Sequence, residues 1–174
     1  MKPFRFLSLV VLIASILLTG CQALERMDNT VEGSGEVIVE KRDLPAFNKI
    51  EAHGDFELYI TQLNEGVEVH AESNLIKYIR TRVENQTLIV DVAGPSGNKV
   101  NLKPLEPIRV YVKLVRIQGV TLSDGVIMTS SQLVAEDARI DLTLSSGSWG
   151  YVNAVRTGTL NVTLSDESEL QVID

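Results

Sequence analysis

The chain has 174 residues, with 16 basic and 23 acidic side chains and a net charge of −7. Sequence-independent binding of nucleic acid needs clustered lysine and arginine, and a chain this acidic excludes it. A scaffold stabilised by disulfides is excluded too, because Cys21 is the only cysteine.

The first 20 residues have the composition of an export signal. Lys2 and Arg5 precede the apolar run Leu7–Leu18, which at about 12 residues is too short to span a ~30 Å hydrocarbon layer. The run ends in Leu18-Thr19-Gly20-Cys21, which resembles a bacterial lipobox. In proteins with that motif the chain is cut before the cysteine and the thiol is acylated. We therefore expect lipidation of Cys21, with an ordinary secretory signal as the alternative, and acyl chains anchor such a protein to its membrane.

Removal of residues 1–20 leaves 154 residues with a net charge of −9, a length that suits one domain. Residues 21–35 are polar and acidic, show no periodicity and contain Gly33 and Gly35, so they predict a flexible tether. Gln22 follows the cysteine, and the absence of Asp there permits sorting to an outer membrane. The expected location is the cell envelope, on its periplasmic side or its surface.

A period of two dominates the domain that we expect over residues 36–174. Val, Ile and Thr supply 40 of the 154 residues, a composition typical of strands. Apolar and polar residues alternate in three clear runs: Glu57–Ile60, Leu88–Val92 and Ile108–Leu114. Asn74–Arg82 is the one stretch with helical spacing, and Gly94–Asn98 predicts a loop.

The last third of the chain repeats a short motif: Val120–Gly125, Leu142–Gly147 and Val162–Glu167. A repeat of about 20 residues, made of a strand and a sharp polar turn, is typical of a solenoid rung, because one rung cannot bury its apolar face alone. In register, Leu122, Leu144 and Leu164 would stack inward. The alternative is chance similarity among hairpins. We expect an all-β, right-handed β-helix-like solenoid, with the charges of Asp166–Asp174 protecting its exposed edge.

Four segments carry a resemblance to a known family: Arg42–Ile50, Gly54–Gln62, Asn74–Leu75 and Thr87–Val90. Their order and spacing resemble the head GIN domain, whose members are usually labelled putative auto-transporter adhesins. The resemblance covers roughly residues 36–174 and implies an exported protein with a β-helix-like fold. It brings no catalytic motif. The chain departs from the family at Ala52–Asp55, where members usually have a Gly-Ser-Gly-Asp-like turn, and it is shorter than many members.

Trp149 and Tyr151 are the candidate binding residues. They flank Gly150, so one side of a strand carries two aromatic rings. Facing inward they would fill a wide rung, and this inward or partly buried placement is the favoured one. Facing outward they would form a platform that stacks on sugar rings or anchors a protein partner.

Other reactive residue types give weaker hypotheses. His53 and His70 lack the further ligands of a zinc site, so no metal or other cofactor is expected. Ser123, Ser145 and Ser165 recur at one position of the repeat, as turn hydroxyls do, and nothing around them resembles the Gly-x-Ser-x-Gly turn of a nucleophile. A glycosidase would need two carboxylates about 5–9.5 Å apart, and the late cluster offers candidates: Asp124, Asp137, Asp141, Asp166 and Glu167. Turn conformation explains acids at such positions equally well.

The sequence thus favours a lipid-anchored, non-catalytic binding or adhesion module of the cell envelope. Its expected partners are the membrane, through the anchor, and a protein or polysaccharide ligand. Two alternatives stay open. One is a β-helical enzyme that degrades polysaccharides with Asp124, Asp141 or Asp166, and the other is a periplasmic structural or assembly factor.

Overall fold

The structure is a computed structural model that describes residues 29–173, apart from the side chain of Asp137. Every regular element in this range is a β-strand except one three-residue 3₁₀ helix, which confirms the all-β prediction. The range includes no helix with the length and hydropathy needed to cross a membrane. Cys21 and the expected export signal lie outside the described residues.

Two sheets make up most of the domain. The six-stranded sheet has the spatial order β14-β12-β10-β3-β7-β6, with these bounds: β3 (Lys49–His53), β6 (Ile79–Glu84), β7 (Thr87–Val92), β10 (Gly119–Ser123), β12 (Leu133–Leu144) and β14 (Val155–Leu164). The seven-stranded sheet has the order β15-β13-β11-β4-β9-β5-β2, with these bounds: β2 (Val37–Arg42), β4 (Glu57–Thr61), β5 (Gly66–Glu72), β9 (Arg109–Lys113), β11 (Ile127–Ser130), β13 (Trp149–Val152) and β15 (Glu169–Val172). A separate parallel pair joins β1 (Thr30–Glu32) to β8 (Asn101–Lys103).

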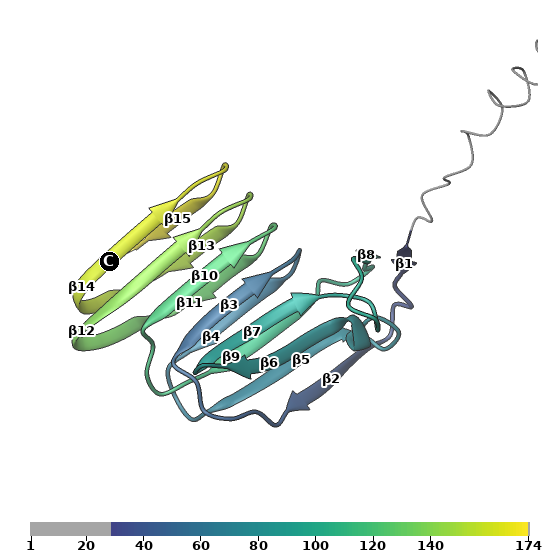
Figure 1. Cartoon of the computed structure of the whole chain (residues 1–174), viewed down its shortest axis with the longest axis horizontal. Helices are drawn as coiled ribbons and strands as arrows, with labels where there is room; N and C mark the ends of the chain where they lie inside the picture. Colours follow the sequence, from purple (N-terminus) through teal and green to yellow (C-terminus); the bar gives the residue numbers. More distant parts are fainter. Residues whose placement is uncertain (1–28, 174) are drawn as a thin grey trace, which may run out of the picture.

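From β9 to β15 consecutive strands alternate between the two sheets, as β3 and β4 do, and we call one strand of each sheet together a rung. The rungs are β3/β4, β7/β9, β10/β11, β12/β13 and β14/β15, and neighbouring rungs pair in parallel in both sheets. Rung β3/β4 lies between β7/β9 and β10/β11, so the chain adds rungs on both of its sides. Beyond β7/β9 the strands β6, β5 and β2 pair antiparallel, which makes the two ends of the domain different (Figure 1).

The three sequence repeats occupy equivalent positions in adjacent strands of the six-stranded sheet. Leu122 pairs with Leu144, and Leu144 pairs with Leu164, as the sequence predicts. Leu122 and Leu144 are fully buried in the core between the sheets, whereas 46% of Leu164 is exposed. The inward stack is therefore complete for two repeats and open at the third.

Each repeat ends in the same kind of turn. Its two central residues have positive φ in all three places, at 61° and 90° for Asp124-Gly125, 52° and 70° for Ser146-Gly147, and 51° and 62° for Asp166-Glu167. Positive φ at both positions favours Gly, Asn and Asp. Ser146 and Glu167 depart from this preference.

The helical expectation for Asn74–Arg82 is wrong for most of the segment. Only Ile76–Tyr78 forms a 3₁₀ helix (η1), and β6 begins at Ile79. Residues 79–84 pair antiparallel with β7, and this tertiary pairing overrides the helical spacing of the apolar residues.

The end of the expected tether lies against the domain. Within residues 21–35, Thr30–Glu32 forms β1, and the backbone N–H of Gly35 donates to the carboxylate of Glu72. Glu72 is fully buried and also accepts a hydrogen bond from the N–H of Leu105 at 2.9 Å. This carboxylate therefore joins the segment before β2 to the loop after β8.

Candidate functional site

Trp149 and Tyr151 lie on the outward face of the seven-stranded sheet. The residues that alternate with them, Gly150 and Val152, are buried. A Cβ atom on Gly150 would lie 2.8 Å from Cδ1 of Leu170, so the core is close-packed on that side. The two aromatic rings do not face inward, because strand alternation and this packing turn both of them toward solvent, but each ring is partly buried, which the favoured placement allowed.

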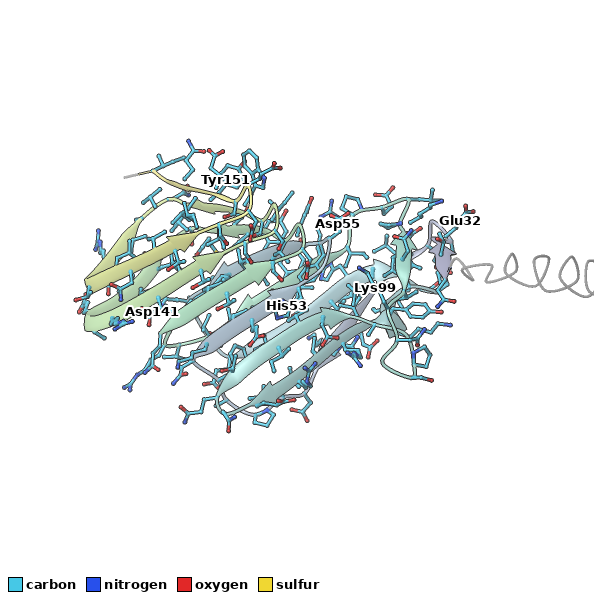
Figure 2. The ribbon with its side chains drawn as sticks, turned by 45° about the horizontal axis from the view of Figure 1, so that its top comes forward. Glu32, His53, Asp55, Lys99, Asp141 and Tyr151 are labelled. Atoms are coloured by element: carbon cyan, nitrogen blue, oxygen red, sulfur yellow. The ribbon has the colours of Figure 1, made fainter. Side chains whose placement is uncertain are left out.

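The pair forms an aromatic platform, defined here as Trp149 and Tyr151. Their ring centroids are 6.5 Å apart and their planes differ by 25°. Trp149 is 39% and Tyr151 36% exposed, and Ile127, the neighbour of Trp149 on β11, is 42% exposed. Figure 2 shows Tyr151 at the top of the view, apart from His53 and Asp141 of the other sheet. Nearly parallel rings beside an exposed aliphatic side chain suit contact with the apolar face of a ligand.

Two further tyrosines stand on the same face, and reasoning from the sequence missed them. Tyr59 and Tyr111 are cross-strand partners with ring centroids 4.9 Å apart and an interplanar angle of 13°. His70 packs against Tyr111 at 4.5 Å. Both tyrosines occupy the polar positions of their alternating strands, which is the signal that could have identified them. Because their ring faces contact one another and they are half-buried, they support the sheet, whereas the platform keeps exposed surface.

Glu57 forms a hydrogen bond with Tyr59, one member of this tyrosine pair. Its Oε2 accepts a hydrogen bond from the Tyr59 hydroxyl at 2.8 Å and another from Arg109 Nε at 3.0 Å. The hydrogen bond to Glu57, followed by burial, raises the pKa of Tyr59 above its usual value of 10.0. Tyr59 is therefore a neutral hydrogen-bond donor at physiological pH.

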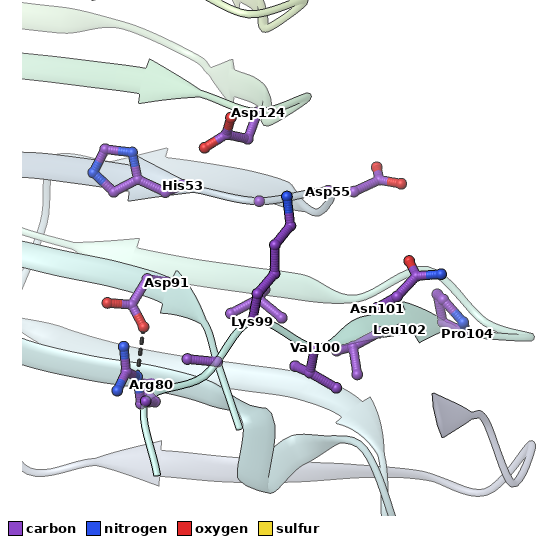
Figure 3. Close-up of a pocket in the computed structure, with 14 residues that line it drawn as sticks. His53, Asp55, Arg80, Asp91, Lys99, Val100, Asn101, Leu102, Pro104 and Asp124 are labelled. Atoms are coloured by element: carbon purple, nitrogen blue, oxygen red, sulfur yellow. Dashed lines mark hydrogen bonds and ion pairs between the residues drawn. The ribbon is translucent and has the colours of Figure 1, made fainter. Parts of the chain in front are cut away.

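A separate cavity of about 600 Å³ lies beside the loop between β7 and β8. Its lining includes the side chains of His53, Asp55, Arg80, Asp91, Lys99 and Asp124. Figure 3 shows Lys99 extending from this loop toward the turns that carry Asp55 and Asp124. Arg80 Nε forms an ion pair with Asp91 Oδ1 at 2.6 Å. Acidic and basic side chains both line the cavity, so its charge favours neither anionic nor cationic ligands.

The structure brings Ser123 next to a base, which reasoning from the sequence missed. Nδ1 of His53 lies 2.6 Å from Ser123 Oγ, and its Nε2 lies 2.8 Å from Glu51 Oε1. A nucleophile, a base and an orienting carboxylate in a row are the side chains of one acyl-transfer arrangement, but they are not sufficient, because the oxyanion also needs free donors. The nearby N–H groups of Gly54 and Gly125 are committed to backbone carbonyl groups. We therefore interpret the three side chains as a hydrogen-bonded ladder on the sheet.

The late carboxylates have structural roles. Asp124 and Asp166 sit at positive φ in the repeated turns, where Asp is favoured for its conformation. Asp141 pairs with Arg139 at 2.6 Å, and hydrogen bonds from Arg139 and Asn161 lower the pKa of its carboxyl group. A general acid needs a raised pKa, so Asp141 is unsuited to that role.

Metal-binding groups do not gather in the part of the chain that the structure describes. Across residues 29–173, no three His, Cys, Asp or Glu side chains are placed to share an ion. His53 contacts Glu51 and Ser123, whereas His70 packs on Tyr111 and lies 3.7 Å from Glu68. Each histidine thus has protein partners.

These features define an all-β domain of parallel rungs that presents an exposed aromatic pair on one sheet. The chain belongs to the family described as "Putative auto-transporter adhesin, head GIN domain", whose model matches residues 46–173. This confirms the resemblance carried by the four segments of the sequence. A search of curated protein sequences found no match.

Solved structures from several bacteria share the fold. A "putative lipid binding protein" from Parabacteroides distasonis is 16% identical, with a TM-score of 0.57 over 82% of this chain and 69% of the other. A "putative adhesin" from the same organism is 14% identical, with a TM-score of 0.57 over 83% and 68%. A "putative adhesin" from Parabacteroides merdae is 14% identical, with a TM-score of 0.51 over 82% and 83%. At these identities the likeness establishes the fold alone.

Proposed function

We propose that the chain is a lipid-anchored cell-envelope protein whose domain is a non-catalytic binding or adhesion module. The observation that carries the proposal is the aromatic platform, because two large rings held outward on a rigid sheet are costly to expose without a ligand. Adhesion is the role given in the family's name, and it fits a surface of this kind.

The anchor in this proposal is an acylated Cys21, with the protein on the outer membrane where the cell has one. The lipobox-like residues before Cys21 support it, as does an adhesin-like family. Serine in place of Cys21 should release the protein from the membrane fraction, and a Cys21→Ser variant that stays in that fraction would contradict the anchor.

The scaffold in this proposal is a short right-handed β-solenoid with rungs of about 20 residues. Parallel pairing of successive rungs in both sheets supports it, as does the matched position of the repeats. A solenoid presents one flat sheet face along its length, which suits an extended ligand such as a polysaccharide.

The test is to remove the platform while keeping the fold. Trp149→Ala/Tyr151→Ala should weaken binding of the full chain to envelope fractions or polysaccharides by about tenfold or more, because both rings are lost from the contact. Circular dichroism should show an unchanged fold, since both side chains point away from the core. A matched control, Thr121→Ala/Thr143→Ala, changes the outward face of the other sheet.

Two results would contradict the proposal. Full binding by Trp149→Ala/Tyr151→Ala would remove the platform from the contact. Release of reducing ends from a polysaccharide, lost on changing Asp124, Asp141 or Asp166, would establish the enzymatic alternative instead.

A further inference from the structure

The rung β14/β15 leaves one end of the core uncovered. Four of its apolar side chains are 37–46% exposed: Leu160, Val162, Leu164 and Val172. Their partners one rung further in are at most 1% exposed: Ile140, Leu142, Leu144 and Val152. The first set occupies inward positions, so it is exposed because no further rung covers it in the structure. Figure 1 shows this end opposite β1 and β8.

The strands at this open end are also unprotected edges. Residues 157–164 of β14 contain neither a charged residue nor a proline, the usual devices that prevent edge pairing. The charges expected to protect the edge lie on the turn, at Asp166 and Glu167, and at Glu169, the first residue of β15, rather than along β14.

The opposite end carries more charge. Its edge strand in the six-stranded sheet, β6, has Arg80, Arg82 and Glu84, and both arginines bind Asp91. The edge strand of the seven-stranded sheet, β2, ends in Glu40-Lys41-Arg42, although its first residues, Val37–Val39, are 37–55% exposed. A head-to-tail stack of copies would pair the uncharged stretch of β14 with the charged edge of β6, which disfavours it.

We infer that the open end binds the open end of a second copy of this chain, β14 against β14 and β15 against β15. A two-fold axis normal to the sheets makes both pairs antiparallel and continues each sheet into its counterpart. The contact covers the exposed apolar side chains of both copies and satisfies the free backbone groups of both edges.

Charge complementarity favours this arrangement and sets its register. Where Asn161 of β14 pairs with its own copy, Arg156 of one chain, near the start of β14, comes beside the turn that follows β14 in the other chain, and this turn carries Asp166. Arg156 is exposed and belongs to none of the ion pairs described within residues 29–173. The two-fold axis forms this ion pair twice.

The arrangement has a consequence for binding. Because the seven-stranded sheets of the two copies become continuous, both aromatic platforms lie on the same side of the dimer. Two platforms that contact one polymer or one surface bind with an effective concentration that a monomer lacks. The dimer itself depends only on the open end and stands even if the platform has another role.

A cysteine at the two-fold axis tests the inference in the full chain. Asn161→Cys should give a disulfide-linked dimer on mild oxidation of intact cells, because antiparallel partners have Cα atoms within the range that a disulfide bridges. The unmodified chain, which keeps Cys21, measures the background. Glu84→Cys is the matched control, since it places a cysteine on the exposed edge at the opposite end.

A charge reversal tests the register without disturbing the core. Arg156→Glu in the Asn161→Cys chain should lower the dimer yield several-fold, because the introduced carboxylate would then face Asp166, whereas Arg116→Glu, outside β14 and β15, should not. Dimer yield at the background level, an equal yield from Glu84→Cys, or a yield unaffected by Arg156→Glu would each overturn the inference. Circular dichroism of each variant checks that the fold is kept.

Discussion

At the scale of single residues, charge pairs control the outward face of the six-stranded sheet. Asp91 accepts hydrogen bonds from both Arg80 and Arg82, and its side chain is only 16% exposed. Burial acts to raise the pKa of its carboxyl group, but the two arginines outweigh it and the pKa lies below its usual value of 3.8. Asp91 is thus a carboxylate that the fold stabilises in its charged form.

The pKa of Asp91 predicts a dependence of stability on pH. A carboxyl group whose pKa is lower in the folded state stabilises the fold above its unfolded pKa and loses that contribution as the pH falls through the folded value, here below about pH 4. Asp91→Asn should cost about 1 kcal/mol in free energy of unfolding at neutral pH, discounted because the arginines are largely exposed.

Urea unfolding at pH 7 and at about pH 3 measures this effect. The difference between the wild-type chain and Asp91→Asn should shrink at the lower pH, whereas Asp141→Asn, which removes an exposed pair with Arg139, should differ less from wild type at both pH values. An equal difference at both pH values would show that Asp91 does not act through its charge.

At the scale of elements, the repeated turns show how local sequence determines structure. Asp124-Gly125 and Ser146-Gly147 place glycine at the second positive-φ position, whereas Glu167 occupies it in the last repeat with φ of 62°. A side chain other than glycine is strained in this conformation, by about 1 kcal/mol.

Replacement of that residue should therefore stabilise the domain. Glu167→Gly should raise the free energy of unfolding by about 0.5–1 kcal/mol, and Gly147→Ala should lower it by about 1 kcal/mol. Nothing lies within 4 Å of a Cβ atom built on Gly147, so that control measures backbone strain alone. A loss of stability in Glu167→Gly would mean that the Glu167 side chain makes a compensating contact.

Local patterns predicted the strands, the turns and the register of the three repeats, because each of these depends on alternation and turn chemistry within about ten residues. These local patterns could not predict which strands pair when they lie far apart in the sequence. The insertion of β10 beside β3, which brings Ser123 to His53, joins residues 70 positions apart. Trp149 faces outward because Leu170 and Met128 pack around Gly150. These two residues lie about 20 positions away in the sequence, so the alternation around Trp149 alone could not predict its direction.

At the scale of the whole molecule, one end is closed by charged antiparallel strands and the other ends in uncovered apolar residues. The segment that leads to the expected anchor joins the domain near the closed end, through Gly35 and Glu72. The platform lies toward the open end, on β13, one rung from the edge. The described segment nearest the expected anchor in sequence and the proposed binding surface are therefore at different ends of the domain (Figure 1).

The platform as a ligand-binding surface is the central claim, and tryptophan fluorescence tests it most directly. Trp149 is the only tryptophan in the chain, so its emission reports on the platform alone. Titration of the full chain with a polysaccharide or envelope fraction that it binds should shift the emission to shorter wavelength and protect Trp149 from acrylamide quenching, since the ligand displaces water from the ring. Saturable binding that leaves both signals unchanged would contradict the account.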